Sequence, residues 1–277
     1  MPSKVNYGRY RVNTDGLVFR VDGYSQRSYS HNTENWKDLG VSGLDVKLTD
    51  TGLYDEDSGY YKFRNPNNGT NKYAAVSGAN FSGLRSLGVL KDDDSSFTIE
   101  AFFEIKPSGE NSPPDDGSVI FGNTDAGKNG YSYGLVAKTG NGGEISGINA
   151  FIASNKIDSN VNIPWTGVEV VLSDVNNPSI SGSDFRHAAM TYNGSNGKMI
   201  GYLDGVVKGT GTFPSDNTSG FHNGTVDGVY QQFYIGGNLD SGLNTNIGVV
   251  GCYNRALSSG EVLGNCKAVK HRYGQGY

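Results

Sequence analysis

The chain has 277 residues, of which 41 are Gly and 17 are Tyr, and 35% are hydrophobic. This composition is typical of many short strands joined by turns, and the length fits one large β domain. A net charge of −5 with scattered basic residues argues against nucleic acid and anionic membranes as partners, and no apolar run is long enough to insert into a bilayer.

An N-terminal arm over residues 1–14 precedes the first predicted strand, and residues 15–277 are predicted to form one domain. No repeat, charge block or long linker divides this region. The start, MPSKVNYGRYRVNTDG, lacks the apolar segment of a secretory signal, which predicts synthesis in a cytosol. We expect the arm to be the segment that a partner holds.

Short apolar runs between turn residues predict strands along the whole domain. Alternation is clearest in SFTIEAFFEI, where the odd positions from Phe97 to Ile105 share one face, and Phe102 indicates cover on the other face. The other predicted strands are 17–21, 60–64, 118–121, 131–137, 148–153, 168–172, 187–192, 231–236 and 247–253.

Two local motifs near the C-terminus are specific. Asp204-Gly205 lies between two extended runs and predicts a type I′ hairpin, because both central residues of that turn need positive φ. Ser258 and Glu261 form a Ser-x-x-Glu capping box, and the apolar residues after it recur at helical spacing. These residues are Val262, Cys266, Val269 and Tyr273. The sequence therefore predicts an all-β sandwich with one amphipathic C-terminal helix.

The chain has two cysteines, Cys252 in a predicted strand and Cys266 in the predicted helix. Their Cβ atoms need not face each other, and nothing in the sequence indicates an oxidising compartment. Two buried thiols are the favoured interpretation, and a disulfide is the alternative.

Four segments, in this order, resemble the concanavalin A-like lectin/glucanase superfamily, and within it the laminin G-like jelly roll. They are DGLVFRVDGYSQRSYSHNTENWKDLG with a following YYKF strand, SSFTIEAFFEI, DFRHAAMTYNGSNGKMIGYLDGVVKG, and QQFYIGGNLD continuing through IGVVGCYNRALSSGEVLGNCKAVKHRYG. The third and fourth segments are the most specific, and together the four span about residues 15 to 274.

The resemblance implies a jelly-roll sandwich of two antiparallel sheets, with ligand chemistry left to loops at the rim. It also implies that Trp36 is a core residue and that His187 is a packed, hydrogen-bonded strand residue. The GLVFRVD-like start and the YNRALS…RYG finish look like structural proteins of tailed bacteriophages. Fold alone does not assign a function, because function depends on the chemistry of a particular site.

Glucanases of this superfamily use closely spaced carboxylates in a Glu-x-Asp-x-x-Glu pattern, which this sequence lacks. Glu100 and Glu104 share a strand face, but four positions along a strand separate their Cα atoms by roughly 13 Å, too far for a retaining pair. We expect both to be solvated at a strand edge. Histidines at zinc spacing, a P-loop and Cys-x-x-Cys are absent from the sequence, and no enzyme activity is predicted.

Calcium is the one cofactor left open, because many domains of this superfamily bind it through loop carboxylates. The weak candidates are Asp92, Asp93 and Asp94. Solvated turns explain these residues, and the clusters 55–57 and 115–116, more simply.

A sugar site needs an exposed aromatic ring beside amide and carboxylate groups, because sugar C–H faces stack on rings while hydroxyls need polar partners. The candidates for carbohydrate binding are Tyr131, Tyr133 and Trp165, with asparagines nearby in the sequence. The alternative is that these rings pack at a sheet edge or a subunit contact.

These observations lead to three hypotheses of function. The first is a non-catalytic bacteriophage virion protein, capsid-decorating or tail-associated, which contacts other virion subunits, is made in the host cytoplasm and binds a host surface glycan. The second is a free carbohydrate-binding lectin or adhesin, and the third is a glycoside hydrolase. A homo-oligomer is compatible with each of them.

Overall fold

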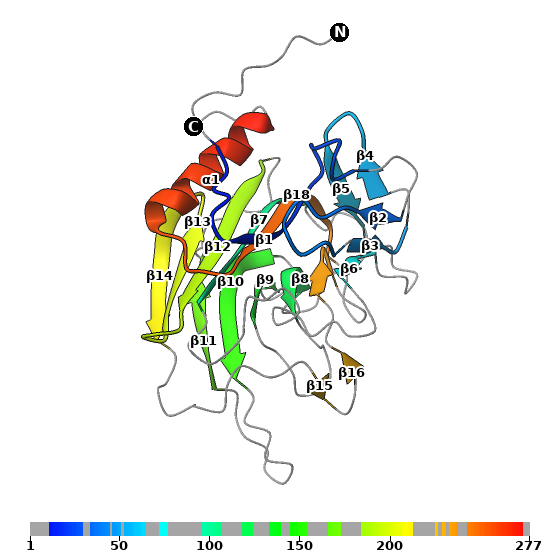
Figure 1. Cartoon of the computed structure of the whole chain (residues 1–277). Coiled ribbons are helices and arrows are strands. Elements are labelled where there is room, and N and C mark those ends of the chain that lie inside the picture. The colour runs from blue at the N-terminus through cyan, green and yellow to red at the C-terminus, as the bar shows by residue number, and fades with distance from the viewer. Residues whose placement is uncertain are drawn as a thin grey trace.

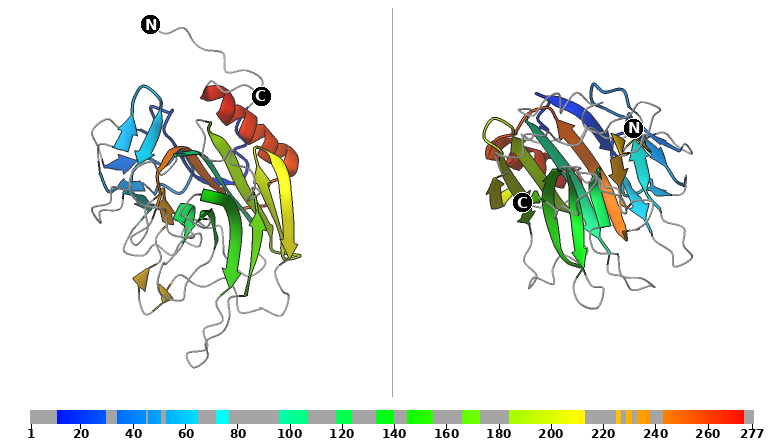
Figure 2. Two further views of the ribbon diagram at one scale, coloured as in Figure 1. Left: turned by 180° about the vertical axis from the view of Figure 1, so that it is seen from behind. Right: turned by 90° about the horizontal axis from the view of Figure 1, so that it is seen from below.

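The computed structural model describes residues 11–29, 34–44, 46–50, 53–64, 72–76, 96–106, 118–123, 133–139, 145–154, 166–172, 184–212, 225–226, 229–230, 233–237 and 243–273. These residues form two antiparallel sheets packed face to face, with one helix at the C-terminal end (Figure 1; Figure 2, right). The prediction of a two-sheet sandwich with a C-terminal helix is confirmed.

Sheet A has eight strands. In order across the sheet they are β14 (Val206–Thr212), β13 (Lys198–Leu203), β12 (Arg186–Asn193), β7 (Phe97–Ile105), β18 (Thr245–Tyr253), β5 (Tyr60–Phe63) and β4 (Tyr54–Asp55), while β1 (Leu17–Asp22) also pairs with β18. Strands β7 and β18, far apart in sequence, therefore lie side by side in the middle of the sheet.

Sheet B also has eight strands. Their order is β11 (Thr166–Val171), β10 (Ile145–Ser154), β9 (Tyr133–Thr139), β8 (Ser118–Asn123), β17 (Phe233–Ile235), β6 (Ala74–Val76), β3 (Val46–Leu48) and β2 (Asn35–Trp36). A separate two-stranded ladder pairs β15 (Thr225–Val226) with β16 (Val229–Tyr230).

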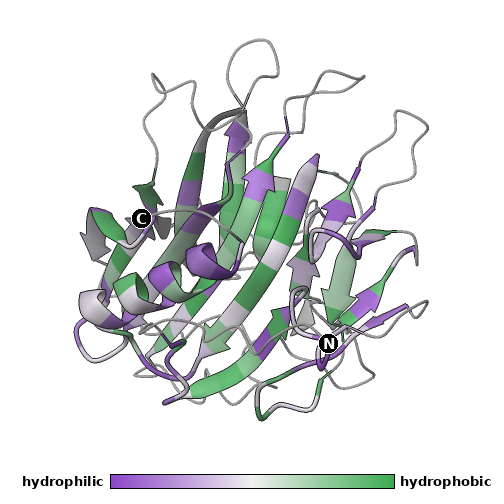
Figure 3. Ribbon diagram, turned by 90° about the horizontal axis from the view of Figure 1, so that it is seen from above, coloured by the Kyte–Doolittle hydropathy of each residue, from purple (hydrophilic) through white to green (hydrophobic). Residues whose placement is uncertain are grey.

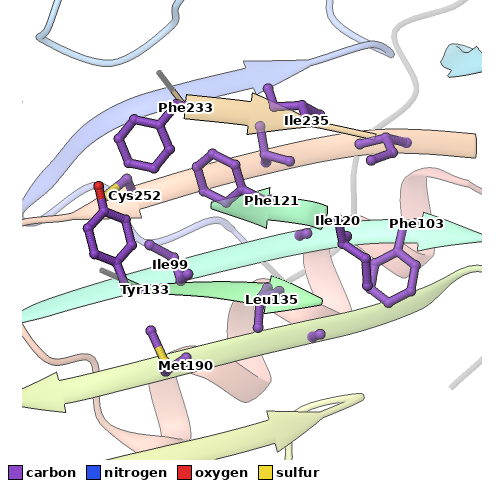
Figure 4. Packing of buried hydrophobic residues seen from close by; sticks show 14 of the residues in the cluster. Ile99, Phe103, Ile120, Phe121, Tyr133, Leu135, Met190, Phe233, Ile235 and Cys252 are labelled. Carbon is purple, nitrogen blue, oxygen red and sulfur yellow. The ribbon is translucent and has the colours of Figure 1, made fainter. Parts of the chain in front are cut away.

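The core lies between the inner faces of the two sheets. Alternate residues of each strand point into it, for example Ile99 and Phe103 of β7 and Leu135 of β9 (Figure 4). Trp36, which the resemblance placed in the core, is fully buried there.

The hairpin between β13 and β14 forms at Asp204-Gly205, where φ is 53° and 75°, as the sequence predicts. The capping box also forms: Ser258 Oγ accepts from the backbone N–H of Glu261, and Glu261 accepts from the backbone N–H of Ser258. Helix α1 (Ser259–Arg272) follows it directly.

Helix α1 lies across the outer face of sheet A, with hydrophilic and hydrophobic residues alternating along it (Figures 1 and 3). Val262 packs with Tyr202 and Tyr253 in one apolar cluster, and Val269 packs with Phe102 in another. The cover predicted from Phe102 is therefore this helix, and the central strands β7 and β18 of sheet A are buried on both faces.

The end of the predicted arm contacts the chain's own helix. The backbone N–H of Asn13 donates to Asn265 at 2.7 Å, its side chain donates to Glu261, and its carbonyl accepts from the Tyr253 hydroxyl at 3.2 Å. Residues 1–10 lie outside the described residues.

Candidate functional site

A charged cluster is buried between α1 and the outer face of sheet A. The carboxylate of Glu100, on β7, accepts from Arg20 Nη1 at 3.1 Å, Tyr253 Oη at 3.2 Å and Asn265 Nδ2 at 3.0 Å, and contacts His187 Nε2 at 3.3 Å. Only 1% of the surface of Glu100 is exposed. Four different elements, β1, β12, β18 and α1, thus meet on one carboxylate.

The cluster continues from Arg20 toward the end of the helix. Arg20 Nη2 lies 3.4 Å from Asp22 Oδ2, and Arg272 of α1 donates to the same Asp22 oxygen. Alternating charges therefore run from His187 through Glu100, Arg20 and Asp22 to Arg272. Each buried charge has an opposite neighbour, which buried ions need.

The surroundings hold both members of the Glu100–His187 pair in their charged forms. Burial alone would raise the pKa of Glu100, but His187, Arg20 and Asn265 lower it to about 2. Burial alone would lower the pKa of His187, but contacts with Cys266 and Glu100 raise it to about 9. The pair is therefore a buried ion pair at neutral pH.

Cys266, His187 and Glu100 together are the residue types of a nucleophile, base and orienting acid. Cys266 lies beside the imidazole, but His187 Nδ1 makes no hydrogen bond, and all three side chains are buried between α1 and sheet A. These contacts hold the helix against the sheet. The packed, hydrogen-bonded His187 that the resemblance implied is confirmed.

Both cysteines are free and buried, which confirms the favoured prediction of two thiols. Cys252 points into the core between the sheets (Figure 4), whereas Cys266 lies under the helix on the outer face of sheet A. The sheet itself separates them, so the alternative of a disulfide is wrong for this structure.

The prediction that Glu100 and Glu104 are solvated at a strand edge is wrong. They do share one face of β7, but β7 is a central strand between β12 and β18, and both side chains are buried. Glu104 contacts Asn246 and Lys106.

The outer face of sheet B carries a different combination of side chains. On β10, Ile148, Ala150 and Ile152 point into the core, so Asn149 and Phe151 point outward. Phe151 is paired with Gly134 on β9 and is half-buried, and a Cβ atom at Gly134 would lie only 2.8 Å from its ring. Glycine at this position therefore lets the ring lean across the neighbouring strand.

Polar groups flank this ring. Glu169, on β11, is paired with Phe151 and accepts from the amide of Asn149, and its carboxylate lies 3.2 Å from Lys138 Nζ on β9. Both Glu169 and Lys138 are partly open to solvent. An aromatic ring, an amide, a carboxylate and an ammonium group thus lie together on strands β9, β10 and β11. We call Lys138, Asn149, Phe151 and Glu169 the β9–β11 patch.

The structure corrects one of the predicted sugar-binding residues. Tyr133 is 1% exposed and packs in the core against Phe97 and Phe233, with ring centroids 5.6 and 5.5 Å away (Figure 4). It begins β9 on the inward-facing register, so its ring cannot stack on a ligand. Phe151, which sequence reasoning missed, points outward on the neighbouring strand.

Tyr131 and Trp165 lie outside the described residues. They stand just before β9 and β11 in the sequence. The first residues of those strands lie at the same end of sheet B, since Tyr133 pairs with Ile152 and Thr166 with Ser154.

The calcium candidates Asp92, Asp93 and Asp94 also lie outside the described residues. Among the residues that are described, no three His, Cys, Asp or Glu side chains come together as metal ligands. Within that same part of the chain, no helix has the length and apolar character to cross a membrane.

No family model and no curated protein sequence matches the chain. Among solved structures it is similar to the binding domain of botulinum neurotoxin DC in complex with SialylT, with a TM-score of 0.61 and 12% identity over 92% of this chain and 52% of that one. It is also similar to Trypanosoma rangeli sialidase in complex with 2,3-difluoro-KDN, with a TM-score of 0.57 and 16% identity over 94% of this chain and 34% of that one.

The chain thus spans about half of the toxin binding domain and a third of the sialidase. At these identities the similarity concerns the fold alone, which is a β-sandwich.

Proposed function

We propose that the chain is a non-catalytic carbohydrate-binding module whose ligand lies on the β9–β11 patch. The observation that carries the proposal is the outward, half-buried ring of Phe151 beside the amide and carboxylate of Asn149 and Glu169. A sugar ring stacks its C–H face on an aromatic ring while its hydroxyls bond to amides and carboxylates.

The absence of catalysis is part of the proposal. A retaining glycosidase needs two carboxyl groups about 5–5.5 Å apart on either side of the sugar. Glu100 instead makes four polar contacts beneath α1, and Glu169 is hydrogen-bonded to Asn149 and paired with Lys138. These carboxylates suit positioning and binding. The botulinum toxin binding domain in complex with SialylT supports a glycan ligand on a similar sandwich.

We expect the full-length protein to bind a surface polysaccharide on a glycan array, and Phe151→Ala to weaken that binding about tenfold or more through the loss of stacking. Tyr24→Ala is the matched control, because Tyr24 is 44% exposed but packs against Tyr273 at the end of α1, away from sheet B. Circular dichroism checks that both variants fold. Equal binding by wild type and Phe151→Ala, or no binding by either, would count against the patch.

We also propose that the module is displayed on a tailed-bacteriophage virion, on the capsid or the tail, after synthesis in the host cytoplasm. The support is the resemblance of two stretches to structural proteins of tailed bacteriophages: the GLVFRVD-like start, which forms β1, and the YNRALS…RYG finish, which runs from the end of β18 through α1. Repetition on a particle would make even weak glycan binding effective through avidity.

The virion proposal is tested on particles purified from the phage that encodes the chain. Quantitative mass spectrometry is expected to find the protein in fixed stoichiometry with a capsid or tail subunit. Its recovery only in the soluble fraction of the lysate would favour a free lectin and leave the sugar-binding proposal standing.

A further inference from the structure

A second buried polar cluster lies on the outer face of sheet A, where β7, β18 and β5 meet. Asn246 is fully buried, and its amide nitrogen donates to Glu104 Oε2 at 2.6 Å. The other oxygen of the same carboxylate contacts Lys106 Nζ. The carbonyl oxygen of Asn246 accepts from Arg64 Nη2 at 2.8 Å. An amine, an amide and a carboxylate are thus held together by one another.

Strand register creates this arrangement. Asn246 of β18 is the direct cross-strand partner of Glu104 on β7, and Thr245 pairs with Ile105. The backbone N–H of Lys106 continues the ladder by donating to Asn244 at 3.0 Å. Because side chains alternate along a strand, Lys106 emerges on the same side as Glu104 and diagonally across from Asn246.

We propose that Lys106 and Asn246 form an intramolecular isopeptide bond, with Glu104 as the acid–base group that transfers the protons. A bond forms between Lys106 Nζ and Asn246 Cγ, and the bond between Cγ and Nδ2 breaks. The Lys106 ammonium gives up two protons through Glu104, and both leave with Nδ2 as an ammonium ion. Glu104 ends unchanged, and no oxidant, reductant or cofactor is required.

Each neighbour has a role in this reaction. Glu104 touches both nitrogens, so it can accept a proton from the attacking amine and deliver one to the leaving group. The Arg64 guanidinium donates a hydrogen bond to the Asn246 side-chain carbonyl oxygen, where negative charge develops during the attack. Burial of Asn246 and Glu104 keeps bulk water away from the amide, and their fixed pairing provides the proximity that intramolecular reactions exploit.

A second lysine makes the inference specific. Lys62 on β5 is the cross-strand partner of Asn246 on its other side, but its ammonium group is paired with Asp55. Asp55 has a lowered pKa, first through its hydrogen bond with Lys62. Lys62 is therefore held in an ion pair with Asp55, and Lys106 is the amine that contacts the same carboxylate, Glu104, as Asn246 does.

The test is the intact mass of the purified full-length protein, measured under denaturing conditions. The cross-linked chain is expected to be lighter than its sequence mass by one ammonia molecule, and a tryptic digest should contain the peptide of Lys106 joined to that of Asn246. Glu104→Gln and Lys106→Arg should each restore the full sequence mass expected for the variant. Lys62→Arg should keep the mass loss.

Two outcomes would overturn the proposal. Wild-type protein with the full sequence mass, after incubation long enough for the intact fold to react, excludes the bond without requiring any variant to fold. A mass loss that survives in Lys106→Arg would place the chemistry on another residue. Because the measurement involves no sugar, its result is independent of glycan binding.

Discussion

Replacing Glu100 with glutamine is expected to lower the free energy of unfolding by about 3–5 kcal/mol, because it leaves buried cations without their counter-charge. Arg20 and His187 both contact the Glu100 carboxylate, and all three side chains are buried under α1. Glutamine has nearly the same shape as glutamate, but its NH₂ group would face one of the groups that now donate to the carboxylate, so two donors would oppose each other. Urea denaturation followed by circular dichroism measures the change.

The control for this variant is Glu169→Gln in the β9–β11 patch. Its carboxylate also pairs with a cation, Lys138, but the side chain is 47% exposed. An exposed pair contributes about 0–1 kcal/mol, so the control should remain close to wild type. Similar losses in both variants would show that the network beneath α1 is not the electrostatic anchor of the helix.

The second large effect is on the pH dependence of stability. Glu100 has a pKa of about 2 in the folded protein against 4.5 as a model value, so its contribution is complete above pH 4.5 and is lost as pH falls toward 2. His187 has a pKa of about 9 against 6.5, so its contribution is complete below pH 6.5 and is lost as pH rises toward 9.

Stability should therefore be highest between about pH 4.5 and 6.5, and it should fall by on the order of 3 kcal/mol as pH drops from 4.5 to about 2 and again as pH rises from 6.5 to about 9. Thermal unfolding between pH 3 and pH 9 measures this profile. His187→Gln should remove most of the alkaline decline. A flat profile for wild type above pH 6.5 would show that His187 is neutral in the folded protein.

Much of the fold follows from local sequence patterns. SFTIEAFFEI, Asp204-Gly205 and the Ser258–Glu261 box each specify their structure through neighbours in sequence, and each forms as predicted. The strands β2, β3, β4 and β6 were missed because they have only two or three residues, too few to show a period of two.

The sites depend on information that is not local. Glu100 is buried because β7 is a central strand and because a helix that begins more than 150 residues later covers it. Neither feature is visible in the residues around Glu100, so the sequence predicts a solvated carboxylate. Phe151, in contrast, could have been found. In INAFIA, the apolar positions Ile148, Ala150 and Ile152 alternate with Asn149 and Phe151, which is the pattern of a ring on the outer face of a strand.

The attachment of Asn13 to α1 has a geometric consequence for any longer assembly. The first and last described segments of the chain, around Asn13 and Tyr273, both lie on the helix side of the sandwich. The β9–β11 patch lies on the opposite side, because two sheets separate it from α1. A support that holds the chain at either of these segments would therefore lie on the helix side, and the sheet face that carries Phe151 would be turned away from it.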